Sequence, residues 1–342
     1  MSSPLLPTTI FKTRAGVEIK FSHLGLGTAP LGNIFAPIPE AVAEATIEAA
    51  WNAGIRYFDT APLYGRGIAE TRLNRTLRPK PRESYTLSTK VGRIMKRTTP
   101  DKMVGHTKYF GTPAREVVYD YSYDGIMRSV EHSLERLGVD RFDALYIHDI
   151  DPVTHESVEV SEAHMRTLFG SGLKALDELK RTGVTRAIGT GLNVIETTER
   201  LVRDADLDLV LLAGRYSLLE QGTLASLFPL CQKKGVGVIA AGVFNSGLLA
   251  GGSTYNYAAA PAELVKRRDA IAAICTKHSV ALAHAALQFP AFHPAVTTTI
   301  FGAVTPAEVK ANVAAKAQPI PADLWRDLKS AGLLALDAPT PI

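Results

Sequence analysis

The sequence of 342 residues is poor in cysteine and has no apolar run long enough to cross a membrane. Its two cysteines, Cys231 and Cys275, lie in apolar segments that look helical. This placement favours reduced core thiols over a disulfide framework or a metal site. The first residues lack the charged and apolar regions of an export signal, so we expect a cytoplasmic protein with no membrane partner.

The chain also lacks a strong charge of either sign. Its formal net charge is +4, and its 38 lysines and arginines are not gathered into a basic stripe, so we expect no nucleic-acid partner. With 46% hydrophobic and 21% charged residues, the composition is that of a globular protein with a sizeable core. A small-molecule ligand, including an anionic one, is compatible with this composition.

Strand-like and helix-like segments alternate along the chain. In the helix expected at 121–137, Ile126, Val130 and Leu134 recur every four residues, and Gly138 supplies a stop signal. Strands are expected at 24–27, 55–58, 85–90, 142–147, 184–189, 207–212, 236–240 and 296–300. Helices are expected at 40–53, 70–77, 121–137, 163–182, 194–203, 223–234, 261–288 and 305–316. Eight strands, each followed by a helix and with no composition break, predict an α/β protein: one (β/α)8 TIM barrel domain over residues 1–342.

Two segments lie outside this repeat. Residues 9–12 and 17–20 flank a short glycine-containing turn and predict an N-terminal β-hairpin. Residues 92–120 carry basic and aromatic side chains without a period, and we interpret them as a long loop after the third barrel strand. Such a loop either makes a solvated surface excursion or covers the substrate. We favour the second, because long loops on this face of a barrel are often functional.

Four polar side chains fall at the carboxyl ends of three successive strands, the end of a barrel where active sites form. Asp59 and Tyr64 follow the second strand, Lys90 ends the third and His148 ends the fourth. Each alone has an ordinary explanation, such as a helix cap or a solvated surface residue, but their convergence on one rim favours a catalytic set. A nearby ammonium favours a phenolate, so the tyrosine could exchange a proton with a substrate oxygen. Two aspartates follow His148, but further ligands are missing at matching strand ends, and we expect no metal site.

The segments that carry these residues resemble the aldo-keto reductase superfamily, and the resemblance covers nearly the whole chain. The matching segments are 54–65, 87–90 and 145–148. The resemblance implies a monomeric-type barrel, hence a monomer or weak homo-oligomer, that binds a nicotinamide cofactor along its rim without a Rossmann fold. It implies that Tyr64 transfers a proton, that Lys90 and Asp59 tune it, and that His148 orients the substrate oxygen.

The resemblance also implies where the cofactor binds. Asn193 matches the position that holds the nicotinamide carboxamide. The glutamine usual before Arg215 and the stacking tyrosine usual after the seventh strand are both absent, so stacking is assigned to Tyr216 or Phe244. The following turn suits a pyrophosphate cradle of backbone amides, although such turns also occur without a ligand. The predicted cofactor set is Asn193, Tyr216, Phe244, Asn245, Ser246, Gly247, Leu248, Gly302, Ala303, Thr305, Glu308 and Asn312.

The last of these residues match the adenosine end of the cofactor. Thr305 is expected to cap the last predicted helix, with Pro306 at its first position. Family members that prefer NADP place basic residues here, whereas this chain has Glu308. Because a carboxylate repels a 2′-phosphate and accepts hydrogen bonds from a free ribose hydroxyl, we predict NAD, with NADP less favoured. Lys310 argues against this prediction, because a basic residue here is the kind that NADP-preferring members carry.

Three sequence segments, at 191–194, 213–219 and 243–249, are similar to those of one branch of that family. Its members, among them L-fucose, D-threo-aldose and pyridoxal dehydrogenases, oxidise a cyclic hemiacetal to a lactone with NAD. The resemblance therefore implies oxidation of an aldose at C1, with Tyr64 as general base. Three alternatives stay open: oxidation of pyridoxal to 4-pyridoxolactone, general aldehyde or ketone reduction, and a cofactor-binding regulatory subunit without activity of its own.

Overall fold

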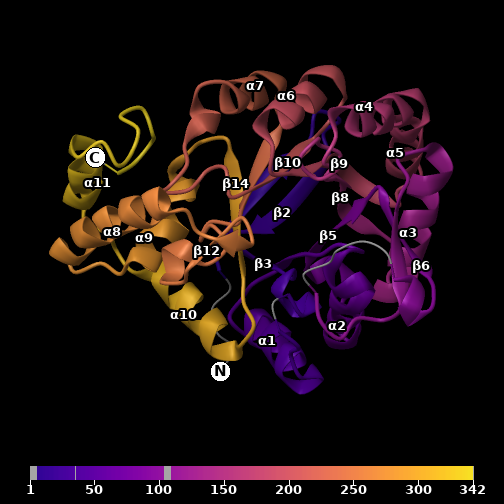
Figure 1. The fold of residues 1–342 in the computed structure, drawn as a ribbon, viewed down its shortest axis with the longest axis horizontal. Helices are drawn as coiled ribbons and strands as arrows, with labels where there is room; N and C mark the ends of the chain where they lie inside the picture. The colour runs from indigo at the N-terminus through magenta and orange to yellow at the C-terminus, as the bar shows by residue number, and fades with distance from the viewer. Residues whose placement is uncertain (1–5, 35, 104–108, 342) are drawn as a thin grey trace.

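Eight parallel strands close into a barrel with helices around it, in a computed structural model that describes residues 6–34, 36–103 and 109–341 (Figure 1). Around the barrel the strands follow the order β3 (Leu24–Gly27), β4 (Tyr57–Asp59), β5 (Thr86–Val91), β8 (Phe142–His148), β9 (Thr185–Leu192), β10 (Leu209–Ala213), β11 (Gly237–Ala241) and β14 (Val296–Gly302). Sequence order and spatial order therefore agree. The predicted (β/α)8 barrel is confirmed.

Helices surround the barrel. They are α1 (Glu40–Asn52), α2 (Ile68–Leu77), α3 (Tyr123–Leu137), α4 (Val158–Thr167), α5 (Leu173–Arg181), α6 (Ile195–Asp204), α7 (Leu227–Lys234), α8 (Ala262–Lys277), α9 (Leu282–Gln288), α10 (Pro306–Ala317) and α11 (Ala322–Ser330). The last of them, α11, packs on α8 rather than on the strands. The cysteines expected as core thiols, Cys231 and Cys275, are buried and unpaired.

Two helical regions differ from the sequence prediction. The helix expected at 163–182 begins earlier, where Ser157 caps α4, and α4 joins α5 through a π-turn at Leu168–Gly172. A Cβ on Gly172 would lie 2.2 Å from the carbonyl oxygen of Tyr121, so the turn brings the helix too close to that backbone for any side chain. Helix α11 was not anticipated, because only three apolar residues in its short span are buried.

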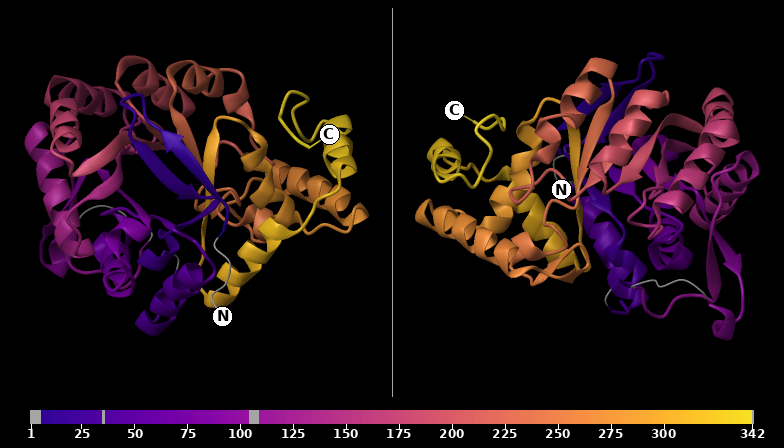
Figure 2. Two further views of the ribbon diagram at one scale, coloured as in Figure 1. Left: turned by 180° about the vertical axis from the view of Figure 1, so that it is seen from behind. Right: turned by 45° about the horizontal axis from the view of Figure 1, so that its top comes forward.

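The predicted N-terminal hairpin is confirmed and closes the amino-terminal end of the barrel (Figure 2, left). Strands β1 (Thr8–Lys12) and β2 (Glu18–Ser22) pair antiparallel, with Thr8 opposite Ser22. Ile19 and Phe21 of β2 point into the barrel and join its interior core. Because apolar side chains fill this end, access to the interior is left to the carboxyl ends of the strands.

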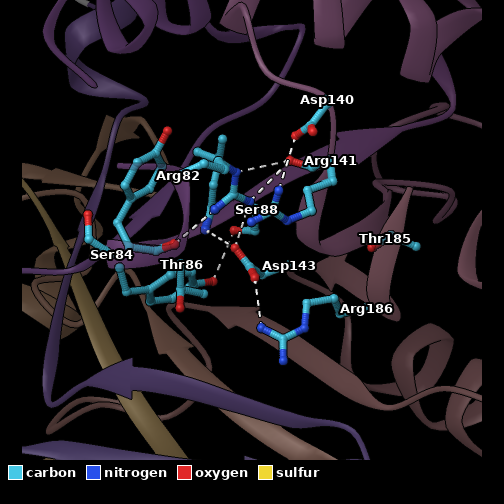
Figure 3. A network of polar contacts seen from close by, with 12 residues as sticks. Arg82, Ser84, Thr86, Ser88, Asp140, Arg141, Asp143, Thr185 and Arg186 are labelled. Carbon is cyan, nitrogen blue, oxygen red and sulfur yellow. Dashed lines mark hydrogen bonds and ion pairs between the residues drawn. The ribbon is translucent and has the colours of Figure 1, made fainter. Parts of the chain in front are cut away.

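A buried carboxylate holds the strands together near the same end (Figure 3). Asp143 of β8 accepts from Arg82 Nη2 at 2.7 Å and from the backbone amide of Leu87 in β5 at 2.9 Å. Its other oxygen accepts from Arg186 of β9 at 3.3 Å. One side chain thus ties three neighbouring strands, and these charges serve the scaffold on the side away from the rim residues.

The segment after β5 contains regular structure that the sequence did not reveal. Strands β6 (Arg93–Arg97) and β7 (Arg115–Tyr119) form an antiparallel ladder, with Arg93 opposite Tyr119. Neither strand alternates between buried and exposed side chains, so no two-residue period marks them in the sequence. Residues 104–108 of the predicted covering loop lie outside the described residues.

The described residues contain no single membrane-spanning helix and no cluster of metal-ligating side chains. No single helix there has the length and apolarity to cross a membrane, while one bent pair, Ala262–Lys277 with Leu282–Phe292, meets that criterion jointly across a 99° bend. No group of three or more histidine, cysteine, aspartate or glutamate side chains there is arranged to hold a metal ion.

Candidate active site

A buried ion pair joins the second and third barrel strands at their carboxyl ends. Asp59 of β4 lies opposite Ser88 of β5, and Lys90 follows two residues later on the same face. The Lys90 ammonium donates to Asp59 Oδ2 at 2.7 Å and to the Thr60 carbonyl at 2.9 Å, while Ser88 Oγ donates to Asp59 Oδ1 at 2.7 Å. Asp59 and Lys90 are each only 2% exposed. Burial raises the pKa of Asp59 above its usual value, opposed by Lys90 and Ser88.

Tyr64 stands directly above this pair. The turn after β4 reverses the chain through Gly65 and Arg66, both with positive φ, and leaves Tyr64 half-buried. The Lys90 ammonium lies 4.7 Å from the centre of the Tyr64 ring, and the His148 ring lies edge-on at 6.0 Å. The predicted rim residues are therefore brought together.

The protonation of Tyr64 differs from the sequence expectation of a stabilised phenolate. Burial, followed by the charge of Asp59, raises the pKa of Tyr64 well above 10. Desolvation of the charged form outweighs the opposing charge of Arg93, because removing a phenolate from water is costly. The side chain is therefore a neutral phenol at neutral pH.

His148 is held as a neutral imidazole. Burial, together with Arg93 and Lys90, lowers its pKa well below 6.5. Its backbone carbonyl accepts from Tyr121 OH at 2.6 Å, and its Nε2 lies 3.4 Å from Asp149 Oδ2. The Nδ1 atom is buried without a hydrogen-bond partner among the described residues. A neutral ring retains one N–H group that can donate to an oxygen.

The structure adds rim residues that sequence reasoning missed. Arg93, the second residue after β5, donates to Asp149 Oδ2 at 2.6 Å, and Asp149 adopts a positive φ of 36°. Tyr109 places its ring 6.3 Å from that of Tyr64. Burial and the nearness of Tyr64 and Tyr257 raise the pKa of Tyr109 well above 10. The signal for Arg93 and Tyr109 was their place in the segment after the third strand, but no spacing singled them out.

Among the predicted cofactor residues, Asn193 lies half-buried at the end of β9. Its backbone carbonyl accepts from Arg215 Nε at 2.7 Å, and Arg215 is in turn paired with Glu220 at 2.9 Å. Its side-chain amide makes no hydrogen bond to the described residues. A fixed backbone with a free amide suits pairing with another carboxamide, such as that of a nicotinamide.

The position of Tyr216 contradicts its predicted stacking role. The side chain is 1% exposed, with its ring 4.7 Å from Phe228 and 4.9 Å from Phe289. Its hydroxyl is buried without a hydrogen-bond partner among the described residues. A tyrosine packed into the core behind the barrel offers no face to a ligand, so of the two predicted stacking residues only the half-buried Phe244 stays a candidate.

The predicted pyrophosphate cradle uses most of its amides internally. Asn245, Ser246 and Gly247 all have positive φ, as expected for a compact turn. The amides of Asn245, Gly247 and Leu248 nevertheless donate to carbonyls within the turn. The Ser246 amide makes no hydrogen bond to the described residues and is left as the donor of this turn that could meet an anion.

The predicted capping role of Thr305 is confirmed. Thr305 Oγ1 accepts from the Glu308 amide at 3.2 Å, and Glu308 Oε2 accepts from the Val304 amide at 2.9 Å, which makes a reciprocal cap for α10. Glu308 therefore has a structural role besides the one predicted. Gly302 is exposed, Ala303 is buried, and Asn312 is half-buried.

A (β/α)8 barrel with an Asp-Tyr-Lys-His set on its rim defines a class of oxidoreductases. The chain belongs to the aldo/keto reductase family, whose model matches residues 23–332. Members of this family use nicotinamide cofactors, and the free amide of Asn193 beside the rim residues fits such a group.

Similar proteins include named dehydrogenases. The chain is 44% identical to pyridoxal 4-dehydrogenase of Microbacterium luteolum, over 94% of this chain and 96% of that protein. It is 41% identical to D-threo-aldose 1-dehydrogenase of a Pseudomonas species, over 96% and 98% of the two chains. Among solved structures, a glycerol dehydrogenase from Gluconobacter oxydans has a TM-score of 0.71 at 22% identity, covering 98% of this chain and 97% of that one. At that identity the likeness concerns the fold alone.

Proposed function

We propose that the protein oxidises the C1 hydroxyl of a cyclic aldose hemiacetal to a lactone, using NAD. The observation that carries this proposal is the buried Asp59–Lys90 pair, which places an ammonium 4.7 Å from the Tyr64 ring beside a neutral His148. The named dehydrogenase relatives support the oxidoreductase class and both leading substrates.

In this mechanism Tyr64 takes the proton of the anomeric hydroxyl. The phenol must first be deprotonated, and because its pKa is raised, oxidation accelerates as the pH increases. The Lys90 ammonium stabilises the phenolate electrostatically, while the hydrogen bond to Asp59 holds Lys90 in place. His148 donates its N–H to the same substrate oxygen and fixes its position. Asn193 would hold the carboxamide of a nicotinamide, which would supply the acceptor for the hydride from C1.

A second substrate, pyridoxal, is favoured by two observations. The relative with 44% identity is a pyridoxal 4-dehydrogenase. The Tyr109 ring, tilted by 40° to that of Tyr64, supplies an aromatic surface beside the reacting position, which suits a flat ring. Pyridoxal in its cyclic form would lose hydride and proton in the same way and yield 4-pyridoxolactone.

The preference for NAD rests on Glu308, which is exposed at the start of α10. Its carboxylate repels the 2′-phosphate of NADP while it also caps the helix. Because one carboxylate serves both roles, a variant that keeps the capping oxygen and removes the charge is needed to separate cofactor preference from helix stability.

The test is a screen of NAD reduction by the purified protein with L-fucose, D-arabinose, L-galactose and pyridoxal, with the lactone identified by mass spectrometry. The control is Tyr64→Phe, which should lower kcat/KM by about 10²- to 10⁴-fold, the usual contribution of proton transfer. NADH binding by this variant, followed by fluorescence, should be unchanged. Inactivity on all four substrates, together with NADPH-dependent reduction of simple aldehydes, would overturn the proposal. Cofactor binding without any turnover would favour a regulatory subunit.

A further inference from the structure

A continuous line of hydroxyl groups runs through the barrel interior to the Asp59 carboxylate. Tyr146 OH of β8 lies 3.3 Å from Tyr57 OH of β4, which lies 3.0 Å from Ser88 Oγ of β5. Ser88 Oγ lies 2.7 Å from Asp59 Oδ1. All four side chains are buried, so water does not replace any of these contacts.

The direction of the protons along this line follows from the chemistry of its end. An ionised carboxylate only accepts, so Ser88 donates to Asp59. The Ser88 oxygen then accepts from Tyr57, and the Tyr57 oxygen accepts from Tyr146. Three hydroxyl protons therefore point toward Asp59, and hydrogen bonds aligned in series strengthen one another.

The second carboxylate oxygen of Asp59 is held by the Lys90 ammonium at 2.7 Å. The carboxylate thus has one donor from the interior line and one from the site. Loss of either donor leaves a buried anion with a single partner.

Packing alone does not account for three hydroxyls in this interior. Two further buried hydroxyls nearby, on Thr86 and Thr298, donate to the backbone carbonyls of Lys20 and Ser22 and take no part in the line. The apolar neighbours are Ile19, Phe21, Ala144, Ala187, Leu209, Leu211, Ile239, Ala241 and Ile300. Barrel interiors are typically filled by branched apolar residues, and a buried polar group costs free energy unless it is hydrogen-bonded. Phenylalanine would fill the space of either tyrosine without that requirement. The hydroxyls are therefore explained by the carboxylate they point toward.

We propose that Tyr146, Tyr57 and Ser88 are positioning residues that hold Asp59 ionised and, through the Asp59 carboxylate, hold the Lys90 side chain in place beside Tyr64. The effect on catalysis rests on the proposed function, in which Lys90 stabilises the Tyr64 phenolate. The effect on Asp59 does not depend on any substrate or cofactor.

The charged groups around Asp59 determine how its pKa changes when a hydroxyl of the line is removed. The Asp59–Lys90 pair is surrounded by titratable groups on two sides. Tyr57, Tyr64 and Tyr146 lie around Asp59. Arg93, His148, Asp149 and Tyr257 lie across the rim, on the side of Lys90. Burial already raises the pKa of Asp59. Without the Ser88 donor its pKa rises further, so Asp59 takes up a proton at a higher pH.

The direct test is an infrared titration of the ligand-free protein. The carbonyl stretch of a protonated buried carboxylic acid is followed against pH and assigned to Asp59 by its absence in Asp59→Asn. Ser88→Ala should shift its appearance upward by about one pH unit, since a hydrogen bond to a charged group typically changes a pKa by that amount. Tyr57→Phe should give a smaller shift and Tyr146→Phe a smaller one still, because each lies one step further away.

Two control variants separate this effect from general loss of buried polar groups. Tyr85→Phe removes the hydroxyl of a buried tyrosine whose ring contacts Phe58 outside the line, and should not move the Asp59 band. Ser88→Thr keeps a hydroxyl and should restore the wild-type titration. If Ser88→Ala does not fold, Tyr57→Phe keeps the ring and its packing and carries the test.

Kinetics supply the second readout. In each variant that shifts the Asp59 titration, the acidic limb of the kcat/KM profile should shift in the same direction and order. An unshifted band in both Ser88→Ala and Tyr57→Phe would overturn the proposal. A shifted band in a protein inactive on every hemiacetal would refute the proposed function instead and leave the positioning role standing.

Discussion

Replacement of Lys90 by methionine should strongly destabilise the protein. Lys90 and Asp59 are each 2% exposed and 2.7 Å apart, so Lys90→Met leaves a buried carboxylate with Ser88 as its one remaining side-chain donor. Removal of one partner of a buried pair costs about 3–5 kcal/mol. For 342 residues, at about 2.1 cal/mol/K of unfolding entropy per residue, this corresponds to a Tm lower by about 4–7 °C.

The double variant Asp59→Asn, Lys90→Met removes both charges and should recover at least half of that loss. The assay is thermal and urea unfolding followed by circular dichroism, arranged as a double-mutant cycle. The loss in Lys90→Met should also shrink as the pH falls through the raised pKa of Asp59, because protonation removes the buried charge. Lys277→Met, which breaks an exposed pair with Asp327, is the matched control and should change little. Strictly additive losses in the cycle would refute the reasoning.

Three further predictions concern other parts of the molecule. Glu308→Gln keeps a capping side chain but removes the charge. The ratio of kcat/KM with NAD to kcat/KM with NADP should therefore fall about fivefold, while Tm stays unchanged. An unchanged ratio would limit Glu308 to helix capping. His148 has a pKa well below 6.5, so kcat/KM should show no inflection from this residue between about pH 6 and 8, where an ordinary histidine titrates. Acidification below about pH 6.5 should destabilise the wild-type protein more than His148→Gln, because the unfolded chain binds a proton at His148 that the folded protein does not. Asp143→Asn weakens the strand tie at the closed end and should lower Tm by about 2–4 °C while kcat/KM is retained; a loss of activity at full stability would contradict a purely structural role.

The fold could be predicted from the sequence because its signals are local. Each barrel strand is a short apolar run bounded by turn residues, and each helix such as α3 shows its spacing and its stop at Gly138. The insertion at β6 and β7 could not be predicted, since two strands of five residues gain their stability from pairing with each other rather than from a local pattern.

The candidate site divides in the same way. Asp59, Lys90 and His148 could be placed on one rim because they end successive parallel strands, whose carboxyl ends share one edge. Tyr216 was misplaced because its neighbours Phe228 and Phe289 come from distant segments, and the core they form is not visible from adjacent residues.

The sequence by itself determined the barrel and the identity of the groups on its rim, since strand order and side-chain alternation follow from local patterns. Only the tertiary structure decided their protonation and their support. Burial raises the pKa of Tyr64 and lowers the pKa of His148, whereas the sequence suggested that a nearby ammonium favours a Tyr64 phenolate. The line from Tyr146 through Tyr57 and Ser88 to Asp59 joins three strands, and desolvation and hydrogen bonding depend on neighbours that are distant along the chain.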